Sequence, residues 1–197
     1  MSTIGIVILA AGGSARLGTP KQLLPYQGVS LLRRAADTAL ASSCAPVVVV
    51  LGASFERCLL ELQDLPLLTV ENRSWKDGMG SSLRLGMERL IGAAPDALDA
   101  VILMLCDQPH LPVAVIEALV AEYRATGCQI AASEYGSTLG VPALFDRALF
   151  PELQTLRGAQ GAKQILQRHP DRIHKLAFAG GEIDIDTAAD YADLNRT

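Results

Sequence analysis

The sequence predicts an α/β fold, namely a three-layer α/β/α sandwich around a mostly parallel sheet with antiparallel pairing in its second half. Two observations lead to this prediction. Short apolar runs alternate with amphipathic stretches along the chain, and the first four runs show no alternation of apolar and polar residues. Strands buried on both faces of a parallel sheet have such sequences, and strand–helix alternation is typical of right-handed βαβ units.

The first half of the chain supplies the parallel strands and the helices between them. The predicted strands are apolar, β-branched and leucine-rich runs, at Thr3–Ala10, Val47–Leu51, Leu67–Val70 and Ala100–Leu105. Helical patterns lie between or after them, at Leu31–Ser42, Phe55–Leu62, Ser81–Leu90 and from Leu111-Pro112 to about Thr126. Proline is tolerated in the first turn of a helix, so Pro112 supports the start of the last one.

The second half is less regular, and we expect it to contribute the antiparallel pairing. Its predicted elements are strands Gln129–Ser133 and Val141–Phe145 around a turn-rich Glu134–Gly140, a helix near Ala159–Arg168, strands His174–Ala179 and Glu182–Ile185, and a closing helix from Ala188. Two glycines between strands indicate a hairpin, here at Gly180-Gly181. No linker or internal repeat interrupts the pattern, so residues 1–197 are predicted to form a single domain.

Composition narrows the class of protein. Of the 197 residues, 50% are hydrophobic and 19% are charged, which predicts a packed core rather than a disordered chain. The net charge of −4 and the pI near 5.4 argue against nucleic acid as a partner. The apolar run from Ile4 to Ala11 is too short to span a bilayer and follows no basic segment, which predicts a cytoplasmic protein without a membrane partner.

The four cysteines predict neither a zinc site nor a disulfide framework. They are far apart in the sequence, without a Cys-x-x-Cys pair, at Cys44, Cys58, Cys106 and Cys128. Free thiols are the usual state of such cysteines in a reducing compartment.

A glycine-rich loop directly follows the first predicted strand. It reads LAAGGSARLGTPK from Leu9 to Lys21, and it lies at the carboxyl end of the strand, where ligands bind in open α/β sheets. Small residues let the backbone approach a ligand, and successive N–H groups can surround phosphate oxygens. Arg16 and Lys21 add positive charge. The loop is therefore predicted to bind phosphate.

Three phosphate-loop templates compete for this segment. The dinucleotide fingerprint G-x-G-x-x-G fails, because the glycines are Gly12, Gly13 and Gly18. The P-loop requires Lys-Ser/Thr where this chain has Thr19-Pro20. The nucleotidyltransferase signature, approximately L-A-A/G-G-x-S-x-R-x-G-x-x-K, is matched at every position.

On these residues the chain resembles the MobA-like NTP transferase family, and within it the molybdenum cofactor cytidylyltransferases. Further blocks in family order carry the resemblance over nearly the whole chain: Lys21–Pro25, Asn72 with Gly78–Leu83, Cys106–Pro109, Gly140–Phe145, Asp184–Thr187 and Asp190-Tyr191. The resemblance implies a Rossmann-like, nucleotide-diphospho-sugar transferase-like fold. It also implies a nucleotide-binding half over about 1–110, an acceptor-binding half over about 111–197, and dependence on Mg²⁺, with Mn²⁺ as an alternative.

Two acidic segments are candidates for holding that metal. Asp107 follows a predicted strand, where a carboxylate can bind Mg²⁺ against substrate phosphates. An ordinary Asp before a proline-containing turn is the structural alternative, and the resemblance favours the metal role. Asp184 and Asp186 share one face of their predicted strand, and the family pattern favours Asp186 as the second ligand. Asp190 is assigned a structural role, in which it caps the last helix or faces solvent on it.

The resemblance implies the following site. The catalytic residues are Arg16, Lys21 and Asp107. The nucleotide contacts are Leu9, Ala10, Ala11, Gly12, Gly13, Ser14, Arg16, Lys21, Asn72, Gly80, Ser82 and Asp107. The metal ligands are Asp107 and Asp186.

The segment around Asn72 and Gly78–Ser82 has two interpretations. Amide and hydroxyl groups beside small residues suit the edge of a nucleobase and a ribose, whereas a capped helix start explains the same residues structurally. Trp75 is interpreted as a loop anchor rather than a base-stacking platform. Gly158–Lys163 departs from the family pattern Gly-Asp-x-Gly-Ala-Arg/Lys, because the acid is missing, which leaves the acceptor open.

The predicted reaction transfers CMP from CTP to the phosphate of molybdopterin cofactor and releases pyrophosphate. Family members that select guanine tend to read Leu-Ala-Gly-Gly, whereas this chain reads Leu9-Ala10-Ala11-Gly12, and Asp107-Gln108-Pro109 is similar to the cytidylyl branch. Alternatives are guanylyl or other nucleotidyl transfer to a different phosphorylated acceptor, such as a sugar phosphate, and a non-catalytic cofactor carrier. A molybdoenzyme or its chaperone would be a further partner.

Overall fold

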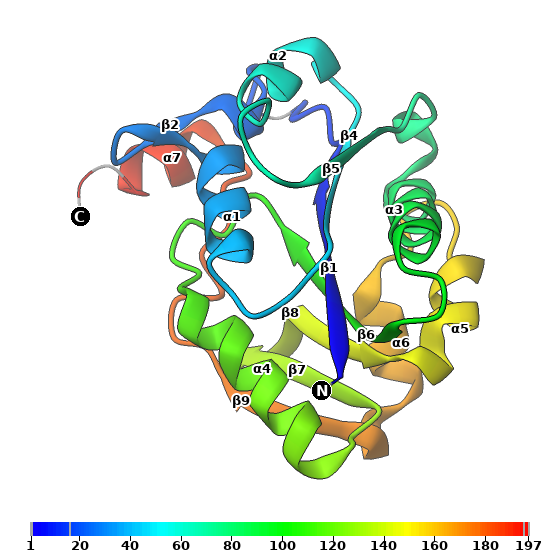
Figure 1. Ribbon diagram of the computed structural model, residues 1–197. Helices are drawn as coiled ribbons and strands as arrows, with labels where there is room; N and C mark the ends of the chain where they lie inside the picture. The colour runs from blue at the N-terminus through cyan, green and yellow to red at the C-terminus, as the bar shows by residue number, and fades with distance from the viewer. Residues whose placement is uncertain (1, 16, 195, 197) are drawn as a thin grey trace.

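The computed structural model describes residues 2–15, 17–194 and 196. A seven-stranded sheet in the order β5-β4-β1-β6-β8-β7-β9 runs through the molecule (Figure 1). Its strands are β1 (Thr3–Ala10), β4 (Val47–Leu51), β5 (Leu68–Glu71), β6 (Leu98–Leu105), β7 (Ile130–Tyr135), β8 (Thr138–Asp146) and β9 (Ile173–Ala177). The strand order confirms the predicted sheet-based α/β class.

Most neighbouring strands of this sheet run parallel. β1 pairs in parallel with β4 and β6, β4 pairs in parallel with β5, and β7 pairs in parallel with β9. β8 runs antiparallel to both of its neighbours, β6 and β7. The prediction of a mostly parallel sheet with antiparallel pairing in the second half is therefore correct.

Helices cover both faces of the sheet and complete the three layers (Figure 1). They are α1 (Leu31–Leu40), α2 (Phe55–Leu60), α3 (Met79–Ala93), α4 (Val113–Thr126), α5 (Phe150–Thr155) and α6 (Ala162–Arg168). Successive residues of β1 point to opposite faces, so Ile6 and Ile8 pack with α1 and α4, whereas Val7 packs with α3, α5 and α6. Both faces of the sheet are consequently apolar, as the continuous apolar strands require.

A smaller apolar cluster lies beside the main sheet. A two-stranded ribbon, β2 (Pro25–Tyr26) and β3 (Val29–Ser30), packs near the last helix, α7 (Ala188–Leu194). Leu24, Ile185 and Leu194 are buried in this cluster. Through this cluster, α7 packs against the segment that follows the glycine-rich loop.

The predicted hairpin at Gly180-Gly181 is wrong, and Glu182–Ile185 is not a strand. After β9 the chain makes turns and then crosses the end of the sheet. The side-chain amide of Gln108 donates to the Gly181 carbonyl at 3.1 Å, and the Ile185 N–H donates to the Asp107 carbonyl at 3.3 Å. Backbone groups that a hairpin would pair are thus bonded to the Asp107-Gln108 turn, and Ile185 gains full burial.

The hairpin of this half lies instead between β7 and β8. The segment Glu134–Gly140, predicted to be turn-rich, is mostly strand, with only Gly136-Ser137 between the two strands. Both turn residues have positive φ, 52° and 62°, which suits a tight two-residue connection. The predicted helix near Ala159–Arg168 begins only at Ala162, and α5 was not predicted.

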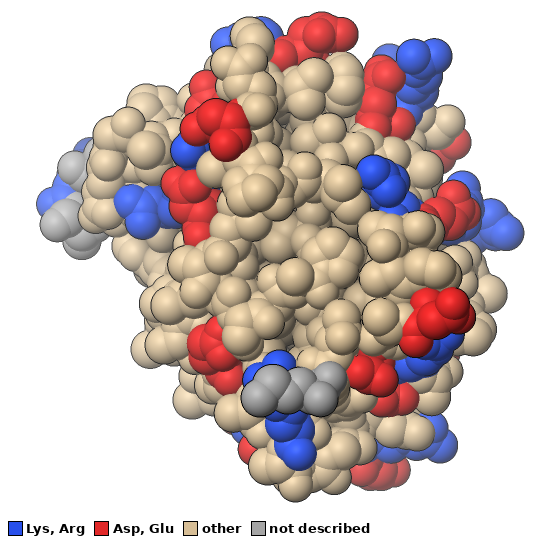
Figure 2. Space-filling model, viewed as in Figure 1, with Lys and Arg blue, Asp and Glu red and all other residues tan. Residues whose placement is uncertain are grey.

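Three further observations bear on the class of protein. The four cysteines are free thiols, as expected, and all four are buried. None of the helices in the described part of the chain is long and apolar enough to cross a membrane. Lys and Arg are interspersed with Asp and Glu over the face shown in Figure 2, rather than gathered into a basic patch.

Candidate active site

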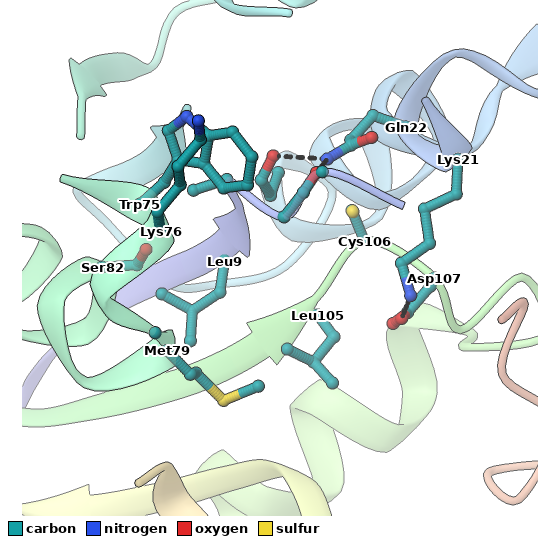
Figure 3. Close-up of a pocket in the computed structure, with 15 residues that line it drawn as sticks. Leu9, Lys21, Gln22, Trp75, Lys76, Met79, Ser82, Leu105, Cys106 and Asp107 are labelled. Carbon is teal, nitrogen blue, oxygen red and sulfur yellow. Dashed lines mark hydrogen bonds and ion pairs between the residues drawn. The ribbon is translucent and has the colours of Figure 1, made fainter. Parts of the chain in front are cut away.

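The candidate active site lies where β1 and β6 end side by side. Leu9 pairs with Leu105 in the sheet register, so the glycine-rich loop and the Cys106-Asp107 segment emerge next to each other. A cavity of about 350 Å³ opens between them (Figure 3). Its lining comprises Leu9, Ala10, Ala11, Gly12, Gly13, Lys21, Gln22, Trp75, Lys76, Gly78, Met79, Ser82, Leu105, Cys106 and Asp107.

The loop turns back on itself so that Lys21 returns to the end of β1. The carbonyl of Ser14 accepts from the N–H groups of Leu17 and Gly18, at 3.0 and 3.2 Å. The Ser14 hydroxyl accepts from the Lys21 N–H at 3.0 Å. Ser14 thus acts through its contacts within the loop, and its side chain is not part of the cavity lining.

Gln22 fixes the backbone of the loop from behind. Its side chain is 1% exposed, and its amide donates to the carbonyls of Ala10 at 2.8 Å and Gly12 at 2.7 Å (Figure 3). Two carbonyls held by one rigid amide fix the direction of the peptides between them. The sequence argument did not assign Gln22 a role, although a polar side chain directly after the loop lysine was a usable signal.

We expect Gln22→Met to loosen this loop. Methionine has similar length and keeps the packing, but it leaves the Ala10 and Gly12 carbonyls without their donor, at a cost of about 1–3 kcal/mol. Chemical denaturation should show the lower free energy of unfolding, and Gln27→Met, at an exposed position, is the control. Equal stability of the two variants would contradict the positioning role.

Lys21 forms ion pairs with two carboxylates from distant parts of the sequence. Its ammonium nitrogen donates to Asp107 Oδ2 at 2.5 Å and to Asp186 Oδ1 at 2.9 Å. Burial disfavours its charge, but the negative charge of Asp107 and the hydrogen bonds to both carboxylates outweigh that cost, so the pKa of Lys21 is raised. Lys21 is therefore protonated at any physiological pH.

Asp107 retains an oxygen that no described group satisfies. Its Oδ1 atom is buried and has no hydrogen-bond partner among the described residues. An unsatisfied, buried carboxylate oxygen beside the Asp186 carboxylate is a suitable donor set for a hard cation such as Mg²⁺ or Mn²⁺. Within residues 2–15, 17–194 and 196, no group of three or more His, Cys, Asp or Glu side chains is assembled for a metal, so substrate or water oxygens would have to complete the coordination.

Asp186 reaches this site from an irregular segment rather than from the predicted strand. The Asp190 carboxylate accepts from the backbone N–H groups of Asp186 at 3.1 Å and Thr187 at 2.7 Å, and Thr187 Oγ1 accepts from Asp190 N–H. This reciprocal capping of α7 confirms the structural role predicted for Asp190. Burial raises the pKa of the neighbouring Asp184, and the charges of Asp107 and Asp186 raise it further.

Cys106 lines the same cavity but is not a nucleophile in this state. Burial raises the pKa of its thiol, and the negative charge of Asp107 raises it further. Because the thiolate is the reactive form, the pocket offers no activated covalent nucleophile from this residue.

The opposite wall of the cavity comes from the start of α3. Ser82 lines the cavity, whereas Asn72 lies behind it, 4% exposed, and donates to Ser81 Oγ and Ser82 Oγ at 2.9 Å each. Gly80 faces away and packs on the backbone of Arg157, where a Cβ atom would approach to 2.7 Å. Asn72 and Gly80 therefore shape the wall rather than line it.

Trp75 packs on the glycine-rich loop, where a Cβ atom on Gly13 would lie 2.7 Å from its ring. This contact fits the predicted loop anchor. The Trp75 ring also faces the cavity, with Lys76 beside it and opposite Lys21 and Asp107 (Figure 3).

A second cavity of about 330 Å³ adjoins the first. The two share Leu9, Met79 and Leu105 as lining residues. The rest of its lining is largely apolar and comes from β6, the β7–β8 hairpin, the segment before α6 and the start of α6: Leu103, Met104, Tyr135, Thr138, Leu139, Gly140, Val141, Ala159, Gly161, Ala162 and Lys163. A ligand could extend from one cavity into the other.

Gln108 connects the wall of the second cavity to the segment that follows β9 and crosses the end of the sheet. It is 8% exposed and donates to the carbonyls of Val141 at 3.0 Å and Gly181 at 3.1 Å. The sequence argument used Gln108 only as part of a motif. Its position next to Asp107 suggests that it holds the turn that presents the carboxylate.

Comparison with known proteins gives this geometry a family. The model of the MobA-like NTP transferase domain matches residues 6–173 of the chain. The chain belongs to the MobA-like NTP transferase family. It is accordingly a nucleotidyltransferase of that family, and the predicted resemblance is confirmed.

Relatives span nearly the full length of this MobA-like chain. It is 35% identical to nicotine blue oxidoreductase of Paenarthrobacter nicotinovorans, over 92% of this chain and 91% of that protein. It is 29% identical to the molybdenum cofactor guanylyltransferase of Rhodobacter capsulatus, over 96% and 88% of the two chains. Among solved structures, Rv0371c of Mycobacterium tuberculosis H37Rv in complex with manganese is 29% identical, with a TM-score of 0.82 and complete coverage of both chains.

The structure brings most of the predicted site residues of this MobA-like transferase together. Eight of the predicted nucleotide contacts line the first cavity, namely Leu9, Ala10, Ala11, Gly12, Gly13, Lys21, Ser82 and Asp107. Ser14, Asn72 and Gly80 support the walls from outside, and Arg16 lies outside the described residues. Asp107 and Asp186 meet at Lys21. The roles assigned to these residues stay predictions.

Proposed function

We propose that this nucleotidyltransferase transfers CMP from CTP to the phosphate of a molybdopterin-type cofactor and releases pyrophosphate. The observation that carries the proposal is the meeting of Lys21 with Asp107 in a cavity lined by the glycine-rich loop. Positive charge, backbone amides and a partly unsatisfied carboxylate in one cavity are what a triphosphate with a divalent metal requires.

The chain's own groups would act mainly by position and charge. The loop from Gly12 to Ser14 would hold the phosphates of CTP, with Lys21 and Arg16 neutralising their negative charge. The acceptor phosphate would attack the α-phosphorus in line, so the protein needs no covalent nucleophile. Asp107 and Asp186 would hold Mg²⁺, with Mn²⁺ as an alternative, and the bound ion would supply charge stabilisation at the reacting phosphates.

The acceptor would occupy the second cavity. Most of its lining residues come from the half of the chain, about 111–197, that we assign to the acceptor, while residues 1–110 carry the nucleotide loop. An apolar lining with Tyr135 and one cation, Lys163, suits a flat ring system that bears an anionic group. The shared wall at Leu9, Met79 and Leu105 would let the acceptor phosphate reach the nucleotide.

The preference for CTP rests on few side chains. Ala11 stands where guanine-selecting members tend to have glycine, and Asp107-Gln108-Pro109 is similar to the cytidylyl branch. One hydrogen bond can reverse a base preference, and the relative from Rhodobacter capsulatus is a guanylyltransferase. Guanylyl transfer, or transfer to another phosphorylated acceptor such as a sugar phosphate, is the alternative within the same chemistry.

Thermal unfolding with each of the four magnesium nucleotides tests the preference. We expect Mg-CTP to raise the unfolding temperature more than Mg-GTP, Mg-ATP or Mg-UTP. A ligand at about 100 times its dissociation constant adds about 2.7 kcal/mol to the free energy of unfolding. A larger shift with Mg-GTP would replace the cytidylyl assignment by a guanylyl one.

Pyrophosphate release with molybdopterin as acceptor tests the reaction itself. Release that requires CTP, the acceptor and a divalent metal together is the expected result. Stabilisation by nucleotide without any pyrophosphate would favour the cofactor carrier. Because one relative is named an oxidoreductase, a nicotinamide dinucleotide belongs among the controls, and stabilisation by it in place of nucleotide triphosphates would overturn the proposal.

A further inference from the structure

Lys21 occupies the space between the two carboxylates that would hold a metal. Its ammonium lies 2.5 Å from Asp107 Oδ2 and 2.9 Å from Asp186 Oδ1. Mg²⁺ would need to lie about 2.1 Å from each of its ligand oxygens. A metal shared by these two oxygens would therefore overlap the ammonium, so Lys21 and such a metal cannot occupy this position together.

The ammonium also neutralises a concentrated negative charge. Asp107 and Asp186 contact it directly. The Lys21 side chain is 17% exposed and that of Asp107 is 9% exposed, so water screens this pair poorly, whereas the Asp186 side chain is 34% exposed. Without a cation at this position, the two carboxylates would repel each other.

Lys21 can leave this position because the nucleotide triphosphate would bind in the same cavity and offer the ammonium other anionic partners. Lys21 and the backbone from Leu9 to Gly13 line one cavity, and a flexible four-carbon side chain lets the ammonium move between neighbouring anions. A triphosphate on the loop would offer Lys21 new oxygens. Its departure would remove the ammonium from both carboxylates.

We propose that the Lys21 ammonium occupies the metal position in the free protein. It leaves this position when it binds the phosphates of a nucleotide, and the metal can then bind. The inference rests on the proposed function for the identity of the nucleotide. Metal and nucleotide binding are then coupled: the free protein binds divalent metal weakly, and each ligand raises the affinity for the other by the same factor.

Mn²⁺ binding to the nucleotide-free protein tests the proposal, with the free ion measured by electron paramagnetic resonance. Lys21→Met should bind Mn²⁺ about tenfold more tightly than the wild type, or better, because a unit charge within a few ångströms of the ion is removed. Lys76→Met is the matched control: Lys76 lines the same cavity but makes no ion pair with either carboxylate. The control should change the affinity far less.

Equal Mn²⁺ affinity of Lys21→Met and the wild type would overturn the proposal, as would an equal gain in Lys76→Met. Neither result depends on turnover, so the proposed function could survive it. Conversely, Lys21→Met could bind Mn²⁺ more tightly even if this protein prefers a nucleotide other than CTP.

A second measurement uses the wild type and so avoids any folding defect of the variant. An amine-directed reagent should label Lys21 slowly in the free protein, and saturating Mn²⁺ should accelerate that labelling severalfold by displacing the ammonium. Lys76, mapped on another peptide, should keep its rate. Mn²⁺ binding without any change at Lys21 would show that metal and ammonium do not compete.

Discussion

Asp107→Ala is expected to reduce nucleotidyl transfer about a thousandfold, equal to about 4 kcal/mol of transition-state stabilisation. Asp107 combines an ion pair to Lys21 with a buried oxygen that has no partner among the described residues. Alanine removes a proposed metal ligand and lets the Lys21 ammonium shift toward Asp186. Turnover under saturating nucleotide and metal is the measurement.

The fold should survive this substitution. Lys21 keeps Asp186 as a partner at 2.9 Å, so no buried charge is left unpaired, and the loss of stability should stay near 1–3 kcal/mol. Circular dichroism and thermal unfolding of the variant would verify that the lost turnover does not reflect an unfolded protein.

Asp184→Ala is the matched control for Asp107→Ala. It removes the same charge from the same end of the sheet, yet Asp184 forms no ion pair with Lys21. Its effect on turnover should remain below about tenfold, the scale of a nearby charge without direct contact. Metal-dependent turnover retained in Asp107→Ala, or an equal loss in both variants, would contradict the role assigned to Asp107.

The parallel half of the fold was predictable because its strands carry their own signal. Thr3–Ala10 and Val47–Leu51 have the predicted bounds in the structure. Each strand is buried on both faces, so its positions carry apolar or small residues. The glycine-rich loop follows from β1 for the same reason, since the end of an apolar run also marks the edge of the sheet.

The irregular half was harder because its structure depends on distant partners. Glu182–Ile185 alternates apolar and acidic residues like a strand, but the Gly181 carbonyl and the Ile185 N–H bond to Gln108 and Asp107 instead. α5 has six residues, too few to show a helical period, and the burial of Phe150 and Leu153 stabilises it. Tertiary contacts decided both segments.

The site shows the same division between local and distant information. The loop residues and Asp107 were found from their place at strand ends. The Lys21–Asp186 ion pair joins residues 165 positions apart, and no spacing rule predicts it. Gln22 was missed because it donates to the carbonyls of Ala10 and Gly12. These contacts depend on the three-dimensional conformation of the loop, which the sequence does not show.

Gly78→Ala should destabilise the protein by about 3 kcal/mol, the largest effect on stability that we expect. Gly78 has φ 101° and ψ 177°, a region that essentially only glycine adopts. An added Cβ atom would lie 2.2 Å from the carbonyl oxygen of Gly158. Backbone strain and overpacking each cost about 1–3 kcal/mol, and a backbone carbonyl cannot simply rotate away.

The strain would reach both cavities, because the start of α3 is joined to the segment before α6. The Gly80 N–H donates to the Gly158 carbonyl at 3.0 Å, and Met79, which lines both cavities, lies against Gly161. If the start of α3 moves away from the segment before α6, Met79 should move with it and the wall between the two cavities should open. Gly78→Ala is therefore also expected to weaken the thermal stabilisation that nucleotide provides.

Gly92→Ala is the control within the same helix. An added Cβ atom there meets nothing within 4 Å, so alanine should stabilise α3 by about 0.5–1 kcal/mol through its higher helix propensity. Urea unfolding of the two variants should thus give changes of opposite sign. If both glycines tolerate alanine equally, the contact between Gly78 and Gly158 does not constrain the fold, and the start of α3 is free to move independently of the acceptor side.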